Sequence, residues 1–186
     1  MALKPTQITY DEPKLAELML YVADQMKDEP SFGATVLNKI LFFSDFLAYR
    51  GNGTPITGAL YQKLPHGPAP RRLLPVQQGL INDRSASLES RDHLGFTQKR
   101  LVALRNADVT MFSTAEKDLV DQVVVTLRRA TATRVSQLSH VISVGWQIAE
   151  MGEEIPYSSV FLSSQKPTKA EIKAAAEFAA KLGIAA

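Results

Sequence analysis

The three histidines, His66, His93 and His140, are the residues of this sequence best suited to acid–base or metal chemistry. A neutral imidazole can ligate zinc or act as a general base. Zinc sites, however, place their ligands at short spacings, as in His-Glu-x-x-His, and no such spacing occurs here. We therefore expect each histidine to make a structural hydrogen bond, and we predict no metal and no cofactor. The alternative is a small metal-dependent enzyme in which the fold brings His66 and His140 together with Asp45.

Serine chemistry is the next candidate, because Ser139 directly precedes His140. Neighbouring residues of a helix point in different directions, so these two do not form a nucleophile–base pair by themselves. The Gly-x-Ser-x-Gly elbow of serine hydrolases is absent, and so are both glycine-rich phosphate-binding motifs. The sequence therefore predicts no catalytic residues and a protein that is not an enzyme.

A stiff loop, His66-Gly67-Pro68-Ala69-Pro70, is the most distinctive local feature of the chain. With Pro65 it holds three prolines, which restrict the unfolded chain, and Gly67 permits close backbone packing or an unusual φ. One interpretation is a packed corner between a strand and a helix. The other is a rigid recognition loop that presents Arg71 and Arg72.

Composition excludes several classes of protein. The chain has 186 residues, 45% hydrophobic and 22% charged, which suits one globular domain. It has no cysteine, so disulfides, thiolate catalysis and cysteine zinc sites are excluded. The sequence shows neither an 18-residue apolar run nor a signal-peptide core, so we expect a cytoplasmic protein without membrane contact. The net charge is only +2, concentrated in residues 56–112, which does not point to a nucleic acid.

Hydrophobic periodicity and capping signals predict a mainly α-helical α+β fold. Residues 1–186 should form a single compact domain with a core of about 12–162, organised around a buried hydrophobic helix at about 34–50. Residues 56–64 and 85–104 should supply a small antiparallel β element. The predicted helices are 12–26, 34–50, 70–78, 114–130 (capped by Ser113 and Glu116), 134–141 (capped by Thr133) and 169–182 (capped by Thr168 and Glu171), with a helical turn at 156–161 and strands at 56–64, 85–93 and 99–104.

The helix pair at 114–141 raises a second functional alternative, a DNA-binding transcriptional regulator of the helix-turn-helix type. Three arginines would then face phosphate: Arg128, Arg129 and Arg134. Only Gln137 and Ser139 in the second helix are suited to reading base edges, and residues 113–186 carry no net charge. Nucleic acid is therefore not the partner we expect.

Three features in a fixed order resemble a known family. A hydrophobic stretch, KILFFSDFLAYRGNGTPITGALYQKL, is followed by a short strand and the corner His66-Gly67-Pro68. Much later come Leu138-Ser139-His140 and then Trp146, and finally IPYSSVFLSS. This order resembles the SocA-like antitoxin family, also called the Panacea domain, over roughly residues 15–162. Ser139 stands where the family pattern has threonine.

The resemblance implies an interaction protein. Members of this family, often encoded in phages and prophages, neutralise a cognate toxin by direct binding, and one type delivers its toxin to a AAA+ protease. The matching residues would shape the core or an adjacent groove: His66, Gly67, Pro68, Leu138, Ser139, His140 and Trp146. We expect Arg71, Arg72 and Trp146 to contact the partner, because Arg and Trp are common at binding hot spots. Self-association into a homo-oligomer stays open.

Overall fold

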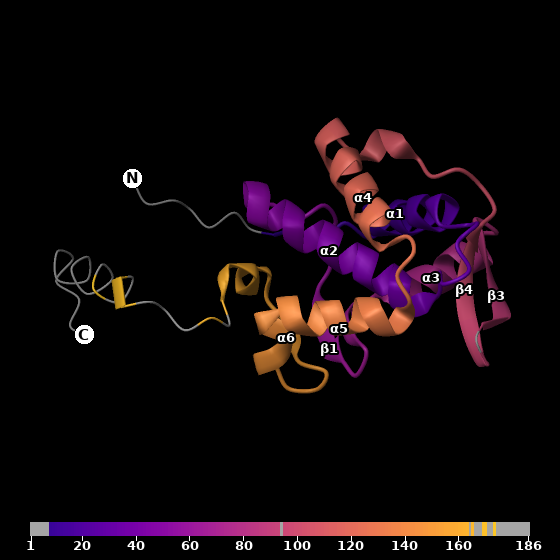
Figure 1. The fold of residues 1–186 in the computed structure, drawn as a ribbon. Coiled ribbons are helices and arrows are strands. Elements are labelled where there is room, and N and C mark those ends of the chain that lie inside the picture. Colours follow the sequence, from indigo (N-terminus) through magenta and orange to yellow (C-terminus); the bar gives the residue numbers. More distant parts are fainter. Residues whose placement is uncertain (1–7, 94, 164, 166–168, 171–172, 174–186) are drawn as a thin grey trace.

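The central element of the fold is helix α2 (Ala34–Asn52), as the computed structural model in Figure 1 shows. Helices α1 (Glu12–Gln25) and α4 (Thr114–Leu127) pack on one side of it, and α5 (Ala132–Ile142) packs on another. The structure describes residues 8–93, 95–163, 165, 169–170 and 173. Within that part the chain is mainly helical with small antiparallel sheets, which confirms the predicted fold class.

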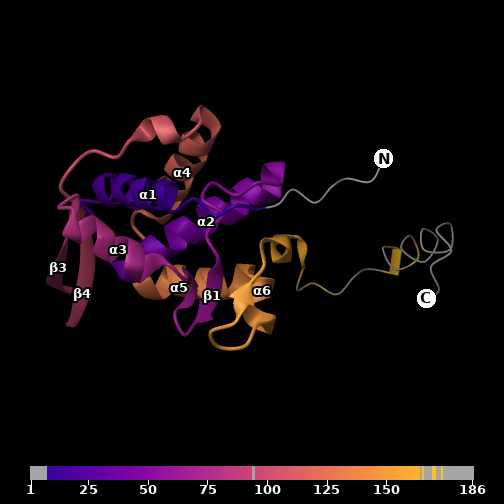
Figure 2. The ribbon, with the colours of Figure 1, turned by 180° about the vertical axis from the view of Figure 1, so that it is seen from behind.

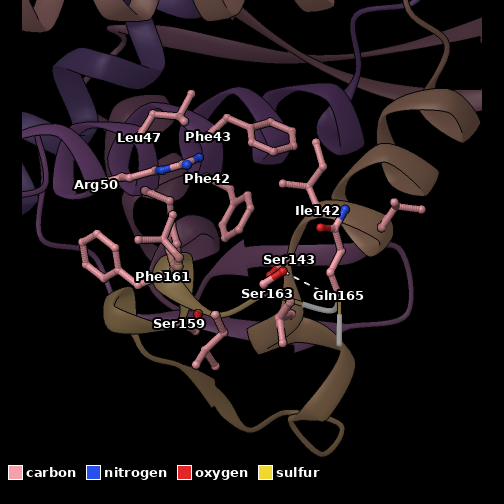
Figure 3. A pocket seen from close by; sticks show the side chains of 15 residues that line it. Phe42, Phe43, Leu47, Arg50, Ile142, Ser143, Ser159, Phe161, Ser163 and Gln165 are labelled. Atoms are coloured by element: carbon pink, nitrogen blue, oxygen red, sulfur yellow. Dashed lines mark hydrogen bonds between the residues drawn. The ribbon is translucent and has the colours of Figure 1, made fainter. Parts of the chain in front are cut away.

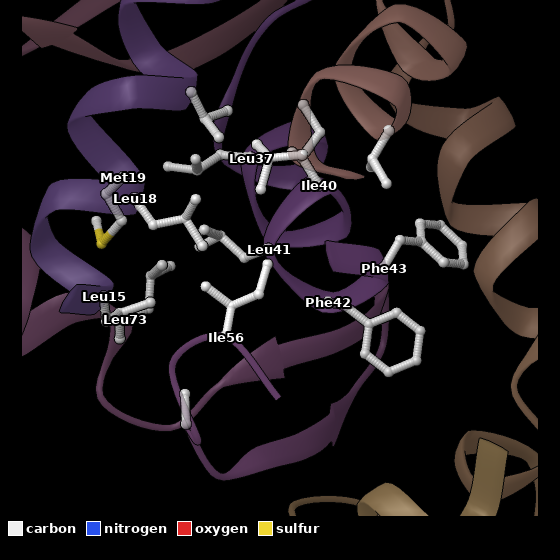
Figure 4. Close-up of a cluster of buried hydrophobic side chains, with 14 of the residues drawn as sticks. Leu15, Leu18, Met19, Leu37, Ile40, Leu41, Phe42, Phe43, Ile56 and Leu73 are labelled. Carbon is white, nitrogen blue, oxygen red and sulfur yellow. The ribbon is translucent and has the colours of Figure 1, made fainter. Parts of the chain in front are cut away.

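Helix α2 is buried over most of its circumference, as its sequence predicts. Its apolar side chains meet those of α1 and α4 in one hydrophobic cluster, part of which is drawn in Figure 4. The helix ends at Gly53, whose φ of 77° lies in the left-handed region and whose N–H donates to the carbonyl of Tyr49 at 2.8 Å. The buried residues of α2 are Val36, Leu37, Lys39, Ile40, Leu41, Phe42, Phe43, Ser44, Asp45, Phe46 and Ala48.

Helix α1 is held at both ends by side chains. The carboxylate of Asp11 accepts from the N–H of Lys14 at 2.9 Å and so caps the N-terminus of the helix. At the other end, Arg100 is buried beneath the last turn although it carries a charge. Its guanidinium donates to carbonyl oxygens of the turn that follows the helix, and so it ties strand β4 to the end of α1. The acceptors are the carbonyls of Met26, Lys27 and Glu29.

Two small antiparallel sheets complete the fold (Figure 2). One has the order β2-β1-β5, formed by Gly67–Pro70, Tyr61–Leu64 and Glu154–Ile155. The other is the hairpin of β3 (Ala86–His93) and β4 (Phe96–Ala103). The hairpin confirms the two strands predicted there and starts β4 three residues earlier. Its turn contains Gly95, at a φ of 81°.

The structure corrects the predicted strand at 56–64. Only residues 61–64 are a strand, because residues 56–59 follow a course set by the buried carboxylate of Asp45, which accepts from Thr57. The proline-rich loop is itself strand β2, paired with β1 from Leu64↔Gly67 to Tyr61↔Pro70. Proline cannot donate to a strand ladder, so it is confined to edge strands, and β2 lies at the edge of its sheet.

Several helix boundaries also differ from the prediction, and α4 ends at Leu127 where residue 130 was predicted. Helix α3 runs from Leu73 to Asn82, so it begins after Pro70 and passes through Gly79. Pro75 falls in its first turn, where backbone N–H groups have no partner in the helix, so it causes no break. Helix α5 is capped by Thr131, which accepts from the N–H of Arg134 at 3.2 Å, and not by Thr133 as predicted.

The remaining elements connect or extend this frame. They are η1 (Val109–Met111), α6 (Val144–Ile148) and η2 (Tyr157–Phe161), and η2 confirms the predicted helical turn. The capping box that opens α4 is present as predicted. The predicted helix at 169–182 lies mostly outside the described residues, although 169, 170 and 173 are helical. None of the described helices is both long enough and apolar enough to cross a bilayer.

Candidate functional site

The corner His66-Gly67-Pro68 and the segment Leu138-Ser139-His140 lie far apart in the chain. These two motifs meet where the β1–β2 hairpin packs against α2 and α5, a contact that we call the motif junction. His66 lies in the turn of this hairpin, and Gly67 and Pro68 begin β2. Gly67 has a φ of 101°, which side-chain-bearing residues rarely adopt. A Cβ placed on it would lie 2.5 Å from Oγ of Ser139 and 2.6 Å from Cε of Lys39. Only glycine fits between the two helices here.

Two serines of α5 connect the helix to this hairpin. Ser139 is fully buried and its hydroxyl donates to the carbonyl of Ser136 at 2.7 Å. The hydroxyl of Ser136 donates to the carbonyl of His66 at 3.0 Å and lies 3.4 Å from Nε2 of His140. Ser139 and His140 therefore form no nucleophile–base pair, since each side chain has a different neighbour.

Trp146, from α6, also packs at the motif junction, the contact between the β1–β2 hairpin, α2 and α5. Its ring stacks on His140 with centroids 3.7 Å apart and an interplanar angle of 8°. Its indole N–H donates to the carbonyl of Leu64 at 3.1 Å, at the end of β1. Nζ of Lys63 lies over the same ring at 4.5 Å and donates to the carbonyl of Ala149. The tryptophan thus joins α5, α6 and the hairpin.

Lys39 is the charged group at the centre of the junction. It is buried in α2, and its ammonium group donates to the carbonyl of Pro68 at 3.0 Å. Burial lowers the pKa of Lys39 to about 7, because the charged form loses its hydration. Burial also lowers the pKa of His140, and the positive charges of Lys39, His66 and Lys63 lower it further.

The other buried charge of α2, Asp45, organises the chain on the far side of the hairpin. Its carboxylate accepts from the N–H and hydroxyl of Thr57, at 2.7 and 2.6 Å, and from the hydroxyl of Tyr61 at 2.9 Å. Burial raises the pKa of Asp45, while these hydrogen bonds lower it. Asp45 therefore uses its oxygens on Thr57 and Tyr61, and it does not join His66 and His140 as the metal alternative requires.

Lys39 was not among the predicted site residues, and Asp45 was considered only as a partner of His66 and His140 in the metal alternative. The signal for them is present in the sequence, because a lysine and an aspartate stand within an otherwise apolar helix, and charged side chains are seldom fully buried without partners. What the sequence lacks is the identity of those partners. Across the described residues, no cluster of three or more His, Cys, Asp or Glu side chains could hold a metal ion.

The predicted partner-binding arginines lie on the surface beside this junction. Arg71 is exposed and donates to the carbonyl of Gly152 at 3.0 Å, and the N–H of Gly152 donates to the carbonyl of Lys63. Arg72 forms an exposed ion pair with Glu12 at 3.1 Å. The structure thus brings Arg71 to the loop that follows Trp146 and directs Arg72 toward α1.

Of the three arginines in the helix-turn-helix alternative, Arg129 and Arg134 are exposed and Arg128 is half-buried. Helices α4 and α5 form the expected pair, but the guanidinium of Arg128 donates to the carbonyl of Gln25 at 3.3 Å and lies 3.9 Å from the carboxylate of Glu29. A guanidinium that binds α1 and its following turn is not presented to phosphate.

Exposed apolar side chains gather next to the second motif. Of fourteen large hydrophobic residues that are exposed in the described part, six lie within residues 141–162, so this segment holds far more than its share. They are Val141, Ile142, Ile148, Met151, Phe161 and Leu162. A groove of about 420 Å³ opens here between α2, the start of α6 and η2 (Figure 3).

Comparison with known proteins assigns the family. The family model of the SocA-like antitoxins, Panacea domain, matches residues 37–147, more than half of the chain. The match includes the corner His66-Gly67-Pro68 and the stretch from Leu138 to Trp146, and it ends before IPYSSVFLSS. Searches of curated proteins and of solved structures found no match. The family match confirms the resemblance drawn from the motifs, within the range of 15–162 expected for it. The chain therefore belongs to the SocA-like antitoxins and carries their Panacea domain.

Proposed function

We propose that this protein neutralises a cognate toxin by direct protein–protein binding. Membership of an antitoxin family supports the role. The observation that carries the binding mode is the exposed apolar surface beside the hydrogen-bonded motif junction. Monomeric proteins seldom leave neighbouring large apolar side chains in water without a partner to cover them.

The surface that we assign to the toxin is the 146–152 segment, which we call the 146–152 face. It exposes Ile148 and Met151, Trp146 packs against His140, and Arg71 is hydrogen-bonded to Gly152 at the end of the segment. Ile148 is 70% exposed and Met151 is 61% exposed, while Trp146 is half-buried. Tryptophan, methionine and arginine are enriched in protein interfaces, and Trp and Arg dominate hot spots. Two of the three predicted partner-binding residues belong to this face.

The motif junction gives the 146–152 face its shape before a partner arrives. Lys63 donates to the carbonyl of Ala149, and Arg71 donates to that of Gly152, so both ends of the loop are held to β1 and β2. Trp146 is fixed by its stack on His140. A surface ordered in advance loses less conformational entropy on binding, which raises affinity.

Arg72, the third predicted residue, contributes at the margin. Its pairing with Glu12 is exposed, and such pairs contribute little to stability because water screens them. The guanidinium can therefore exchange Glu12 for an acidic group of the toxin at small cost. Its role is to orient the encounter, since rim charges act mainly on association rate.

The test starts with a pull-down of the tagged full-length chain from its host, followed by mass spectrometry of the bound proteins. The partner gene is then expressed alone and together with this protein. Toxicity that disappears on co-expression, with a stoichiometric complex of the two purified proteins, is the expected result. A partner that is harmless alone, or toxicity that persists on co-expression, would refute the antitoxin role.

A matched pair of variants tests the 146–152 face. Ile148→Asp and Val125→Asp both replace a side chain that is 70% exposed, one on this face and one on α4. Loss of a hot spot costs about 2 kcal/mol or more, so Ile148→Asp should weaken the complex by about 30-fold. Val125→Asp should leave the affinity unchanged. Equal affinities of the two variants would remove the face from the proposal.

The same pull-down separates the other routes. A AAA+ unfoldase that is recovered with the toxin indicates a proteolytic adaptor, in which neutralisation is lost when the protease is absent. For a DNA-binding regulator, the purified protein would shift DNA with a steep salt dependence. DNA binding without a toxic partner would favour the regulator over the antitoxin.

A further inference from the structure

Strand β3 is the outer strand of the β3–β4 hairpin, and it lies at the margin of the body in both views (Figures 1 and 2). Strand β4 packs against α1 and α2, whereas the helix that β3 contacts most is α3. In the described part of the chain no third strand pairs with β3. One edge of this eight-residue strand is therefore open to pairing with another strand.

The backbone groups at the open edge follow from the register of the hairpin. The N–H of Leu104 donates to the carbonyl of Ser85 at 2.8 Å, which makes these two residues a hydrogen-bonded pair. In an antiparallel ladder such pairs alternate with pairs whose N–H and C=O groups point away from the partner strand. From the register of β3 with β4, Leu88, Ser90 and Asp92 direct their backbone groups to the open edge. All three residues are exposed.

The open edge of β3 lacks the usual protection against another strand. Edge strands are commonly protected by proline or lysine, and β2 shows this, because Pro68 and Pro70 cannot donate to a further strand. Strand β3 contains neither residue type. The charges at its centre, Glu89 and Arg91, form an exposed ion pair at 2.7 Å and so cancel. The centre of β3 therefore carries no net charge that would repel a second strand.

We propose that two copies of this chain associate through residues 88–92 of β3, antiparallel and related by a two-fold axis at Ser90. Leu88 of each copy then pairs with Asp92 of the other, and the two Ser90 residues pair with each other, so that each pair exchanges backbone hydrogen bonds. The two hairpins become one four-stranded sheet of order β4-β3-β3-β4. A two-stranded hairpin is only marginally stable in water, so the added strands stabilise both copies.

The order of charges in β3 favours a second copy as the occupant of this edge. In the proposed register Glu89 of each copy lies directly opposite Arg91 of the other, at positions where cross-strand side chains are closest. Of the two nearest registers that keep the backbone hydrogen bonds, one places Glu89 against Glu89 and the other places Arg91 against Arg91. Like charges directly opposite each other are destabilising. The stretch Glu89-Ser90-Arg91 is therefore complementary to itself in the proposed register.

Two charge reversals test this register by analytical ultracentrifugation of the full-length chain without toxin. Glu89→Arg places positive charges opposite each other, and Arg91→Glu places negative ones, so each variant alone should dimerise at least about tenfold more weakly than the wild type. An equimolar mixture should regain the wild-type affinity as a one-to-one heterodimer, identified by native mass spectrometry, because opposite charges face each other again. Both variants lack the ion pair within the chain, so that pair cannot account for the recovery.

A crosslink tests the axis without changing any charge. The chain has no cysteine, so Ser90→Cys supplies the only thiol of each copy. Val125→Cys is the matched control, at a site on α4 that is 70% exposed. A short bis-maleimide should join two chains of Ser90→Cys at least about tenfold faster than two chains of Val125→Cys, since paired thiols stay within reach.

Three results would each overturn the proposal. They are a wild-type chain that stays monomeric up to its solubility limit, a mixture of the two charge variants that associates no better than either alone, and equal crosslinking rates of Ser90→Cys and Val125→Cys. No toxin is present in any of these measurements, so their outcome is independent of the antitoxin role.

Discussion

The buried ammonium of Lys39 makes the stability of this protein depend on pH in a direction that can be worked out. The pKa of Lys39 is lowered from 10.5 to about 7 in the folded protein. Between these values the unfolded chain binds a proton at this site and the folded protein does not. Stability therefore rises with pH across this range, because the unfolded state releases its proton as the pH increases.

The size of the effect follows from the linkage relation. Each pH unit between the two pKa values contributes about 1.4 kcal/mol, so the free energy of unfolding should rise by about 2 kcal/mol from about pH 7.5 to pH 9. Other groups affect neighbouring ranges. The lowered pKa of His140 affects stability below the ordinary histidine value of 6.5, and the raised pKa values of Tyr61 and Tyr157 affect it above 10.

The perturbation is Lys39→Met, which keeps an unbranched side chain of similar length and removes the charge. It leaves the carbonyl of Pro68 without its donor, at a cost of about 1–3 kcal/mol that does not vary with pH. The variant should therefore lose the slope between about pH 7.5 and 9. Lys27→Met, at a largely exposed lysine, is the control and should keep it.

Urea unfolding followed by the fluorescence of Trp146, which is the single tryptophan, measures the free energy at each pH. The decisive quantity is the difference in slope between the wild type and Lys39→Met. Parallel lines, with the two proteins separated by a constant offset, would refute the reasoning. They would mean that Lys39 keeps an ordinary pKa in the folded protein and that its burial does not desolvate the ammonium.

Three further predictions concern the motif junction and the frame around it. Gly67→Ala should cost about 2 kcal/mol or more through its positive φ and the close contacts of a Cβ, whereas Gly79→Ala, in open space on a helix, should stabilise by about 0.4–1 kcal/mol; thermal unfolding compares them. Arg100→Ala should lower stability by about 3 kcal/mol, because buried carbonyls at the end of α1 lose a charged donor, and a loss under 1 kcal/mol in urea unfolding would contradict this. Acidification should quench the fluorescence of Trp146 with a midpoint below 6.5, as the stacked His140 gains a proton with a lowered pKa, and His140→Asn should abolish the transition.

The sequence by itself determined the helical frame. Local signals suffice for it, because caps and periodicity act within a few residues: Asp11 for α1, the box of Ser113 and Glu116 for α4, and the apolar run of α2. The motifs of the junction were likewise sufficient to indicate the family. Each of these features depends on interactions between near neighbours or on a pattern of residue types.

Only the tertiary structure decided the structural role of the residues in these motifs. That the proline-rich corner is strand β2 depends on β1 beside it, since a strand forms only with a partner. That Gly67 must be glycine depends on Lys39 and Ser139, which approach it from two other helices. Local propensity cannot encode such distant contacts. The burial of Lys39, its lowered pKa and the groove between α2 and η2 follow from the packing of whole elements, and only the assembled fold defines them.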